Sequence, residues 1–438
     1  MESGKTGLDI WMNGEHCGRW RVTTEGIHEF AYMPGWLESP LSRPISISMP
    51  LGSRERRFQG PKVEALFDNL LPDNPEIRRR IQARVGAAST NAYDLLREIG
   101  GDCAGAFQFL PEGSEPGGQN RIEGIPLDEA QMAEKLRSRI APIALGHGDE
   151  DDFRISLAGA QEKTAFLWHD GGWHQPLGAT PTTHIFKFAL GKVGGFQGDF
   201  SASIENEWLC ARIAHEFGLP VAECAMGRFE DMRVLIVTRF DRKLGSGGWW
   251  LRLPQEDMCQ ALAAPKNVKY ESEGGPGMEQ ILEFLLGSRE AEADRQKFFK
   301  SLGLFWLLCA PDGHARNFSI SIEAGGRYVL TPLYDILSAY PVIGHGKNLL
   351  APEKVKLAMA VHGNHRHRKW DRIIQTHWFE AAHRAGMRSA GERIIADLAN
   401  QTASVADRVA TALPEGFPAS VADPILEGMR KAAKRLVP

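Results

Sequence analysis

Several features that mark specialised protein classes are missing from this 438-residue chain. Its longest apolar run, LGLFWLLCA at 302–310, is too short to span a membrane. Its formal net charge of −4 does not indicate a nucleic-acid-binding protein. The N-terminal MESGKTGLDIW lacks the apolar core of a signal peptide, so we expect a cytoplasmic protein with no membrane partner. No Cys-x-x-Cys pair is present, which predicts reduced thiols rather than a disulfide scaffold, at Cys17, Cys103, Cys210, Cys224, Cys259 and Cys309.

The pattern along the chain changes from strand-rich to helix-rich. A hairpin is predicted around Asn13-Gly14, and PISISMPL at 44–51 alternates with period two, as a strand does. STNAYDLLREIG predicts a helix capped by Ser89 or Thr90. From about residue 250 the pattern is mostly helical, interrupted by the strand pair FSISIEAGGRYVLTPL. We therefore expect an α+β, bilobal protein with its functional site between the lobes.

Two polar stretches suggest boundaries between domains. PEGSEPGGQNRIEGI at 111–125 is rich in Pro and Gly, and GHGDEDD at 146–152 is a second soft boundary. We predict a β-rich N-terminal subdomain with helices at 1–148 and a core at 149–438, itself divided into 149–243 and 244–438. Within the core we expect a small antiparallel sheet, a flexible loop at 191–200, a helix at about 203–217 and a hairpin with a buried second strand at 225–242.

The stretch RISLAGAQEKTAF at 154–166 superficially resembles a phosphate-binding loop. A Walker A loop needs glycine immediately before its lysine, and Glu162 stands there instead. A kinase-type G-x-G-x-x-G loop also fails, because only Gly159 is present. By itself this stretch favours an ordinary turn between two strands.

A second pattern carries more chemistry. In CAPDGHARNFSI, Asn317 follows Asp312 by five residues, the interval that separates the catalytic Asp from the metal-binding Asn in protein kinases. Asp335 follows after the strand pair, where a second carboxylate ligand for Mg²⁺ is expected. The loop on its own favours a turn that uses Asp and Gly for backbone reasons.

A kinase also needs a cation for the nucleotide phosphates. Lys187 lies on the apolar strand THIFKFAL, where an ammonium group is costly unless it faces a cleft, and Lys163 is its competitor. Glu207, on the following helix, is a candidate partner for Lys187 or else a solvated surface residue. The order of these elements along the chain favours a kinase: a loop of small residues, a lysine on a strand, a glutamate on a helix, a buried hairpin and a loop with Asp and Asn.

The stretch VHGNHRHRKW at 361–370 is rich in cations and imidazoles. It holds His362, His365 and His367 but no cysteine or carboxylate in a metal-binding spacing. We interpret it as an exposed loop, with contact to nucleic-acid phosphates as the alternative.

Seven motifs in order resemble the HipA family, the serine/threonine-kinase toxins of bacterial HipBA toxin–antitoxin modules. They are DFRISLAGAQEKTAFL, TPTTHIFK, RFDRK, LRLPQEDMCQAL, VKYESEGGPG, DGHARNFSI and LTPLYDILSAYP, and NLLPDN and DLLREIG extend the likeness towards the N-terminus. The resemblance covers almost the whole chain. It implies a kinase-like bilobal fold with an extra N-terminal subdomain, and ATP with Mg²⁺ as the phosphoryl donor.

The resemblance also implies roles for individual residues. Asp312 would be the catalytic base, and Asn317 and Asp335 would hold Mg²⁺. Ser156 would be an autophosphorylation site that silences the kinase by expelling the adjacent loop. Nucleotide contacts would come from that loop, from the strand lysine, from the hinge and from the catalytic segments: Leu157, Ala158, Gly159, Ala160, Gln161, Glu162, Lys163, Lys187, Thr238, Arg239, Phe240, His314, Arg316, Asn317, Tyr334 and Asp335.

The family's biology supplies further expectations. The substrate would be glutamyl-tRNA synthetase, whose phosphorylation stops translation and causes growth arrest and antibiotic tolerance. The partner would be a HipB-type helix-turn-helix antitoxin, with which the toxin represses its operon on operator DNA. The alternatives are a small-molecule phosphotransferase, which shares the Asp/Asn/Asp layout, and a catalytically dead corepressor.

Overall fold

The computed structural model describes residues 7–52, 57–118, 120–140, 155–159, 161–193, 198–265, 268–346 and 349–437. The chain divides into two compact units. Unit 1 comprises Met1–Phe188, Gly227–Asn267 and Ile320–Tyr328, and unit 2 comprises Ala189–Met226, Val268–Ser319 and Val329–Pro438. The boundary that we predict at 148/149 lies outside the described residues and stays a prediction.

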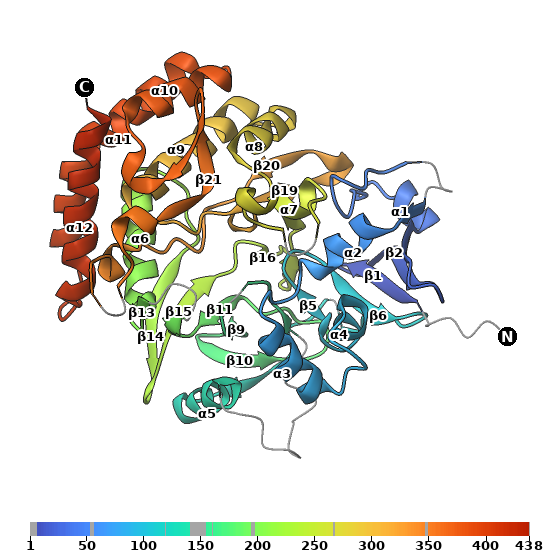
Figure 1. Cartoon of the computed structure of the whole chain (residues 1–438). Helices are drawn as coiled ribbons and strands as arrows, with labels where there is room; N and C mark the ends of the chain where they lie inside the picture. The colour runs from blue at the N-terminus through green and yellow to red at the C-terminus, as the bar shows by residue number, and fades with distance from the viewer. Residues whose placement is uncertain are drawn as a thin grey trace. The chain divides into compact units, whose positions relative to one another are not determined.

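The first sheet of unit 1 is antiparallel, in the order β4-β3-β2-β1-β6 (Figure 1). Its strands are β1 (Leu8–Met12), β2 (Glu15–Val22), β3 (His28–Tyr32), β4 (Arg57–Gln59) and β6 (Gln108–Pro111). The predicted hairpin is confirmed, because Asn13 and Gly14 connect β1 to β2 with φ values of 48° and 88°. Buried aromatic rings, among them Trp20, Phe30 and Phe67, fill the core beneath this sheet.

Four helices accompany this sheet, namely α1 (Pro34–Glu38), α2 (Pro61–Asp68), α3 (Pro75–Val85) and α4 (Ala92–Ile99). Local chemistry sets the limits of α3: the Asn74 side chain accepts a hydrogen bond from the Glu76 N–H, and Gly86 ends the helix with φ 65°. The predicted cap of α4 is wrong by one or two residues. Asn91 occupies the cap position, while the Ser89 hydroxyl donates to Asp94 at 2.6 Å.

PISISMPL does not form the strand that its alternation predicts. The segment turns back on itself, with an isolated bridge between Ser46 and Met49. The backbone N–H groups of this segment bind side chains of other elements instead of a neighbouring strand. The Ile45 N–H donates to the Tyr32 hydroxyl, and the Ile47 N–H donates to the Glu256 carboxyl group. Tertiary contacts therefore override the period-two pattern here.

A second sheet, most of whose residues belong to unit 1, is larger than the small sheet that we predict. Its order is β14-β15-β11-β9-β10-β7. The strands are β7 (Gly124–Leu127), β9 (Lys163–His169), β10 (Gly172–Pro176), β11 (His184–Lys187), β14 (Cys224–Phe229) and β15 (Met232–Thr238). Helix α5 (Glu129–Ile140) covers one face through Met132 and Leu136, which pack with Phe166 and Phe186. The β14–β15 hairpin is confirmed, and β15 is mostly buried.

Unit 1 is completed by short elements. β5 (Asp102–Cys103) pairs in parallel with β8 (Ile155–Ser156), and β16 (Arg242–Leu244) pairs with β17 (Trp250–Arg252). β18 (Gln255–Asp257) leads into α7 (Met258–Ala261), which Asp257 and Gln260 cap reciprocally. The strand pair that we predict at 318–333 is formed by β19 (Ser319–Ile322) and β20 (Tyr328–Leu330), whose residues are divided between unit 1 and unit 2.

Unit 2 begins with a segment that we expect to be a flexible loop. Its two ends instead form paired strands, β12 (Gly191–Val193) and β13 (Gly198–Phe200), while 194–197 lie outside the described residues. Helix α6 (Ser203–Glu216) follows as predicted. Its stripe of Leu209, Ile213 and Phe217 is fully buried, which explains the spacing of four residues between them.

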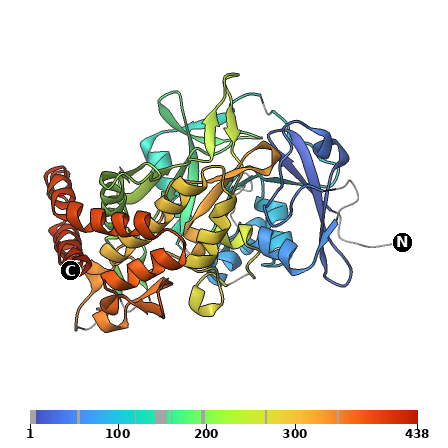
Figure 2. The ribbon, with the colours of Figure 1, turned by 90° about the horizontal axis from the view of Figure 1, so that it is seen from above.

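The helical part of unit 2 contains α8 (Met278–Phe284), α9 (Ala291–Leu307), α10 (Gln375–Arg384), α11 (Arg388–Thr411) and α12 (Ala419–Ala433). Helix α11 packs against α9, α10 and α12, and its orange-red coils lie beside those of α12 in Figure 2. The hairpin of β21 (Lys356–His362) and β22 (Arg366–Lys369) packs on α8 and α10. Among the described residues, no helix has both the length and the apolar character needed to cross a membrane.

Short 3₁₀ helices join these elements, at Glu271–Glu273, Leu285–Gly287, Ala315–Asn317, Ala324–Gly326, Tyr340–Val342, Pro352–Lys354, Trp370–Arg372 and Lys434–Leu436.

Candidate active site

The loop that carries Asp312 follows directly after helix α9, whose C-terminal half is buried. Cys309 takes a left-handed conformation, with φ 47°, and turns the chain out of the helix. The Asp312 side chain remains half-exposed, at 51% of its accessible surface. The Tyr270 hydroxyl donates to Asp312 Oδ1 at 2.6 Å, and His314 Nε2 lies 3.9 Å from the same oxygen. The carboxylate is therefore oriented by a neighbour and still reachable by a substrate.

Asn317 stabilises the same loop through hydrogen bonds to its backbone. It is buried, its backbone N–H donates to the His314 carbonyl at 2.9 Å, and its Nδ2 donates to the Asp312 carbonyl at 2.8 Å. Because the amide nitrogen is used in this way, Oδ1 is the side-chain atom of Asn317 that is suited to binding a cation. The five-residue interval therefore lets the Asn317 amide bind the backbone of the residue that carries the reachable carboxylate.

The segment that carries Asp335 is tied to this loop by Tyr334. The Tyr334 hydroxyl donates to the Arg316 carbonyl at 2.9 Å and lies 2.5 Å from the Ser319 hydroxyl. Asp335 itself is half-buried and takes a left-handed conformation, with φ 61°. A non-glycine residue in this conformation is strained and persists only where the surroundings hold it.

Hydrogen bonds on both sides of Asp335 supply that support. The Leu333 N–H donates to the Pro220 carbonyl at 2.8 Å, and the Leu333 carbonyl accepts from the Ala222 N–H. Beyond Asp335, Ser338 exchanges two hydrogen bonds with the buried Asn206 side chain, at 2.9 and 2.8 Å. Asp312, Asn317, Arg316 and Tyr334 thus share one hydrogen-bonded framework in unit 2, and Asp335 adjoins it.

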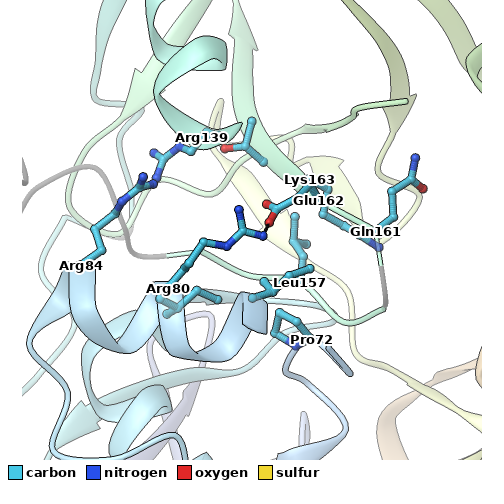
Figure 3. A pocket seen from close by; sticks show the side chains of 11 residues that line it. Pro72, Arg80, Arg84, Arg139, Leu157, Gln161, Glu162 and Lys163 are labelled. Atoms are coloured by element: carbon cyan, nitrogen blue, oxygen red, sulfur yellow. Dashed lines mark hydrogen bonds and ion pairs between the residues drawn. The ribbon is translucent and has the colours of Figure 1, made fainter. Parts of the chain in front are cut away.

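The loop that follows β8 belongs to unit 1 and is fixed to the segment before α3. Ser156 is fully buried, and its hydroxyl donates to the Leu70 carbonyl at 2.8 Å. The Asp73 N–H donates to the Gly159 carbonyl at 3.1 Å. At the far end of the loop, Glu162 forms an ion pair with Arg80 of α3 (Figure 3). Leu70 and Asp73 of the NLLPDN stretch therefore hold the loop in place.

The interior of the loop is shaped by Gly159 and Lys163. Gly159 has φ 112°, and a Cβ atom there would lie 2.7 Å from Lys163 Nζ. Lys163 Nζ donates to the Ala158 carbonyl at 2.7 Å, so it stabilises the loop itself. Gln161 donates to the Phe188 carbonyl, and Leu157 is buried. The predicted contact Ala160 lies outside the described residues.

Lys187 and Glu207 are both buried, with 6% and 7% of their surfaces exposed. The alternative that Glu207 is a solvated surface residue is therefore wrong. Lys187 stands opposite Lys163 in the β11–β9 ladder, so both side chains start from the same face of the sheet. Their assignments as nucleotide contacts stay predictions.

A cluster of buried charges follows β15, where we predict the hinge at Thr238–Phe240. The Arg239 guanidinium donates to the Asp241 carboxylate and lies 3.3 Å from the Asp102 carboxylate. The backbone N–H of Arg239 donates to the Thr183 carbonyl, and the backbone carbonyl of Arg239 accepts from the Arg242 N–H. The assignment of Arg239 as a nucleotide contact stays a prediction. Burial raises the pKa of Asp102, but the surrounding guanidinium groups of Arg242, Arg239 and Arg252 outweigh it and hold the pKa well below its ordinary value.

The basic stretch at 361–370 is not a plain exposed loop, because most of it forms the β21–β22 hairpin. His362 Nδ1 lies 2.5 Å from Glu279, and Arg366 and Arg368 each lie 3.6 Å from Glu271. The His367 ring stacks on that of His377, with 3.6 Å between centroids. Contact with nucleic acid stays a prediction.

Sequence reasoning overlooked the residues that hold the Asp312 loop of unit 2 and the loop after β8 of unit 1 in place. Tyr270 orients Asp312, while Leu70, Asp73 and Arg80 anchor the phosphate-loop candidate. Tyr270 lies in VKYESEGGPG, and Leu70 and Asp73 lie in NLLPDN, two of the motifs quoted above. The motifs therefore contain these residues, although a motif alone does not show which groups their atoms contact.

Comparison with known proteins agrees with the arrangement of these motifs. Residues 155–406 match the HipA-like C-terminal domain, and residues 8–110 match the HipA N-terminal domain. The chain belongs to the HipA family. It is 34% identical to "Putative kinase Y4mE" of Sinorhizobium fredii, over 80% of this chain and 82% of that protein. It is 28% identical to the "Serine/threonine-protein kinase toxin HipA" of Shewanella oneidensis, over 70% of this chain and 69% of that one.

A solved structure supports the fold of the whole chain. The HipA chain of the Shewanella oneidensis HipA–HipB–operator DNA complex superimposes with a TM-score of 0.78, at 21% identity, covering 98% of this chain and 97% of that one. The predicted α+β fold, with a strand-rich N-terminal part and a helical C-terminal region, is thereby confirmed. The relatives' names also support kinase activity as a general class for this family.

Proposed function

We propose that this HipA-family chain is an ATP-dependent protein serine/threonine kinase. One observation carries the proposal: in unit 2 a reachable carboxylate, Asp312, a buried amide, Asn317, and the Asp335 segment are joined by a single hydrogen-bonded framework. This is the set of groups that phosphoryl transfer requires from a catalytic loop.

Each residue has a distinct task in this proposal. Asp312 accepts the proton of the substrate hydroxyl and orients that oxygen, while Tyr270 keeps the carboxylate in one rotamer. Asn317 Oδ1 and the Asp335 carboxylate are the hard oxygen ligands that would hold Mg²⁺, which neutralises phosphate charge when it is bound. Such a site needs only one or two protein carboxylates or amides, because the phosphates supply further oxygens.

The nucleotide phosphates would be covered by the loop from Ser156 to Lys163, with Lys187 as their cation. Adenine would be held by backbone groups near Thr238 and Phe240, and His314 and Arg316 would line the catalytic side. We propose a protein serine as acceptor, with glutamyl-tRNA synthetase as the first candidate. A HipB-type antitoxin and operator DNA are the proposed partners, since HipA of Shewanella oneidensis forms such a complex.

The decisive test is transfer of label from [γ-³²P]ATP to proteins of a cell lysate, followed by identification of the labelled protein. Asp312→Asn should lower transfer at least about a hundredfold, because the base is lost while the loop's backbone hydrogen bonds remain. Growth arrest should disappear in this variant and co-binding of operator DNA with the antitoxin should persist. Arrest that survives Asp312→Asn would contradict the kinase mechanism, and label found only on small molecules would favour a small-molecule phosphotransferase.

We further propose that Ser156 is an autophosphorylation site. Its hydroxyl is buried against the Leu70 carbonyl, so the loop must release this hydrogen bond before the serine can react. Ser156→Ala should abolish self-labelling while the first turnover on a protein substrate remains. Mass spectrometry of the wild-type protein after incubation with ATP provides the check, and a phosphate located elsewhere would refute the assignment.

A further inference from the structure

The stretch VKYESEGGPG at 268–277, in unit 2, holds Tyr270 through its own backbone. The Tyr270 carbonyl accepts hydrogen bonds from the Glu273 and Gly275 N–H groups, both at 2.9 Å. The Tyr270 hydroxyl is the group that donates to Asp312 at 2.6 Å. The backbone that carries this hydroxyl is therefore fixed within its own turn, and the position of the whole turn decides where the hydroxyl lies.

Glu271, the next residue, connects this turn to the β21–β22 hairpin. Its Oε2 accepts a hydrogen bond from the Ala360 N–H at 2.5 Å. Its Oε1 lies 3.6 Å from Arg366 Nη1 and 3.6 Å from Arg368 Nη2. Only 9% of the Glu271 side chain is exposed, so solvent screens its carboxylate weakly. One carboxylate thus binds a backbone group of β21 and two cations of β22.

Strand β21 also holds the loop of Asp312. The Ala358 N–H donates to the Pro311 carbonyl at 2.9 Å, immediately before Asp312. Ala358 and Ala360 are two residues apart on one strand, so their N–H groups leave it on the same edge. The β21–β22 ladder shifts register in the middle of β21, where both alanines lie. The same edge of β21 therefore fixes the segment before Asp312 and the segment after Tyr270.

We infer that Glu271 is a positioning residue for phosphoryl transfer, which acts through Tyr270 on Asp312. The inference rests on the proposed kinase activity and adds a residue to it. Tyr270 and Asp312 lie forty-two positions apart in the sequence, and β21 is the element that binds both of their segments. Without the Glu271 carboxylate, the turn loses its attachment to β21, and the Tyr270 hydroxyl no longer holds the Asp312 carboxylate in the productive orientation.

Gly277 provides a second way to test Glu271. A Cβ atom at Gly277 would lie 2.7 Å from Glu271 Cδ and 2.9 Å from Glu271 Cγ. An alanine at this position would therefore push the carboxylate away from the Ala360 N–H. Gly277→Ala displaces the Glu271 side chain without removing its charge, so it should have the same effect on turnover as Glu271→Ala.

Steady-state kinetics distinguish a positioning role from a general loss of stability. Tyr270→Phe and Glu271→Ala should each lower kcat about tenfold, the effect of about one hydrogen bond to a charged group, and change KM for ATP less than about twofold. Added to Tyr270→Phe, Glu271→Ala should lower kcat by less than about another twofold, because both changes act on one contact. Glu271→Gln keeps an oxygen for the Ala360 N–H and should lose less activity than Glu271→Ala.

Glu273→Ala is the matched control, because Glu273 is an exposed glutamate of the same turn. Its kcat should stay within about twofold of that of the wild-type protein. The inference is overturned if Glu273→Ala and Glu271→Ala lower kcat equally. It is also overturned if Glu271→Ala still lowers kcat about tenfold in the Tyr270→Phe background, or if Glu271→Gln loses as much activity as Glu271→Ala.

Hydrogen exchange follows the same contact without any reaction. Glu271→Ala should speed exchange in the peptide 309–318, which carries Asp312, and Glu273→Ala should not. Exchange in α6 should stay unchanged in both variants, which shows that the fold is retained. Wild-type protein that transfers no phosphate would refute the proposed function, whereas unchanged exchange at 309–318 in Glu271→Ala would refute the role of Glu271.

Discussion

Replacing Asp102 with asparagine tests how much the buried charge cluster of unit 1 contributes to stability. The Asp102 carboxylate lies 2.8 Å from Arg242 Nη2, 3.2 Å from Arg252 Nε and 3.3 Å from Arg239 Nη1. It also accepts hydrogen bonds from the Thr182 N–H and hydroxyl, at 3.0 and 2.6 Å. All of these groups are buried, so solvent cannot replace the carboxylate.

The magnitude follows from the charges that remain. The native cluster holds three guanidinium groups and two carboxylates, and the variant leaves Asp241 alone with the three cations. Removing one partner of a buried ion pair typically costs about 3–5 kcal/mol. The amide that replaces the carboxylate adds an N–H group facing other donors, so we expect the upper half of this range. Such a loss is a large part of the roughly 5–15 kcal/mol that stabilises a typical domain.

Urea unfolding followed by tryptophan fluorescence measures the loss. Glu112→Gln is the matched control, because Glu112 pairs with Arg19 and Arg21 at a partly exposed position and should cost less than about 1 kcal/mol. Adding Arg252→Met to Asp102→Asn should recover part of the loss by removing one uncompensated cation. A cost below about 1 kcal/mol for Asp102→Asn, or a further loss in the double variant, would refute the reasoning.

Two other changes test single contacts. Burial raises the pKa of Glu256 from its ordinary value of 4.5 to about 8. Between these two pH values the Glu256 carboxyl is protonated in the folded state and ionised in the unfolded state. The free energy of unfolding therefore falls as the pH rises through this range, by at most about 1.4 kcal/mol per pH unit. Glu256→Gln should remove this slope in urea titrations from about pH 5 to 8, and parallel curves for the two proteins would contradict the assignment. Tyr334→Phe should cost about 1–2 kcal/mol and lower phosphoryl transfer at least about tenfold, because the hydroxyl links the Asp335 segment to the catalytic loop. Unchanged stability and turnover would show that this link has no role.

The features that the sequence predicts correctly depend on residues close together in the chain. Asn13-Gly14 defines a tight turn through its own backbone preferences, and the stripe of Leu209, Ile213 and Phe217 defines the buried face of α6. The interval between Asp312 and Asn317 likewise predicts one loop, and the structure joins the two residues by a hydrogen bond. In each case the residues concerned lie within eight positions of one another in the sequence.

The features that the sequence does not reveal depend on partners far away along the chain. PISISMPL has the alternation of a strand, but Glu256 accepts the Ile47 N–H from more than two hundred residues away and the segment turns instead. Arg80 and Glu162, eighty-two residues apart, anchor the loop for which the local pattern predicts an ordinary turn. A single sequence determines which groups need partners, because charge and hydrogen-bonding capacity are properties of each residue. Which partner they receive is decided only when the folded chain brings distant segments together.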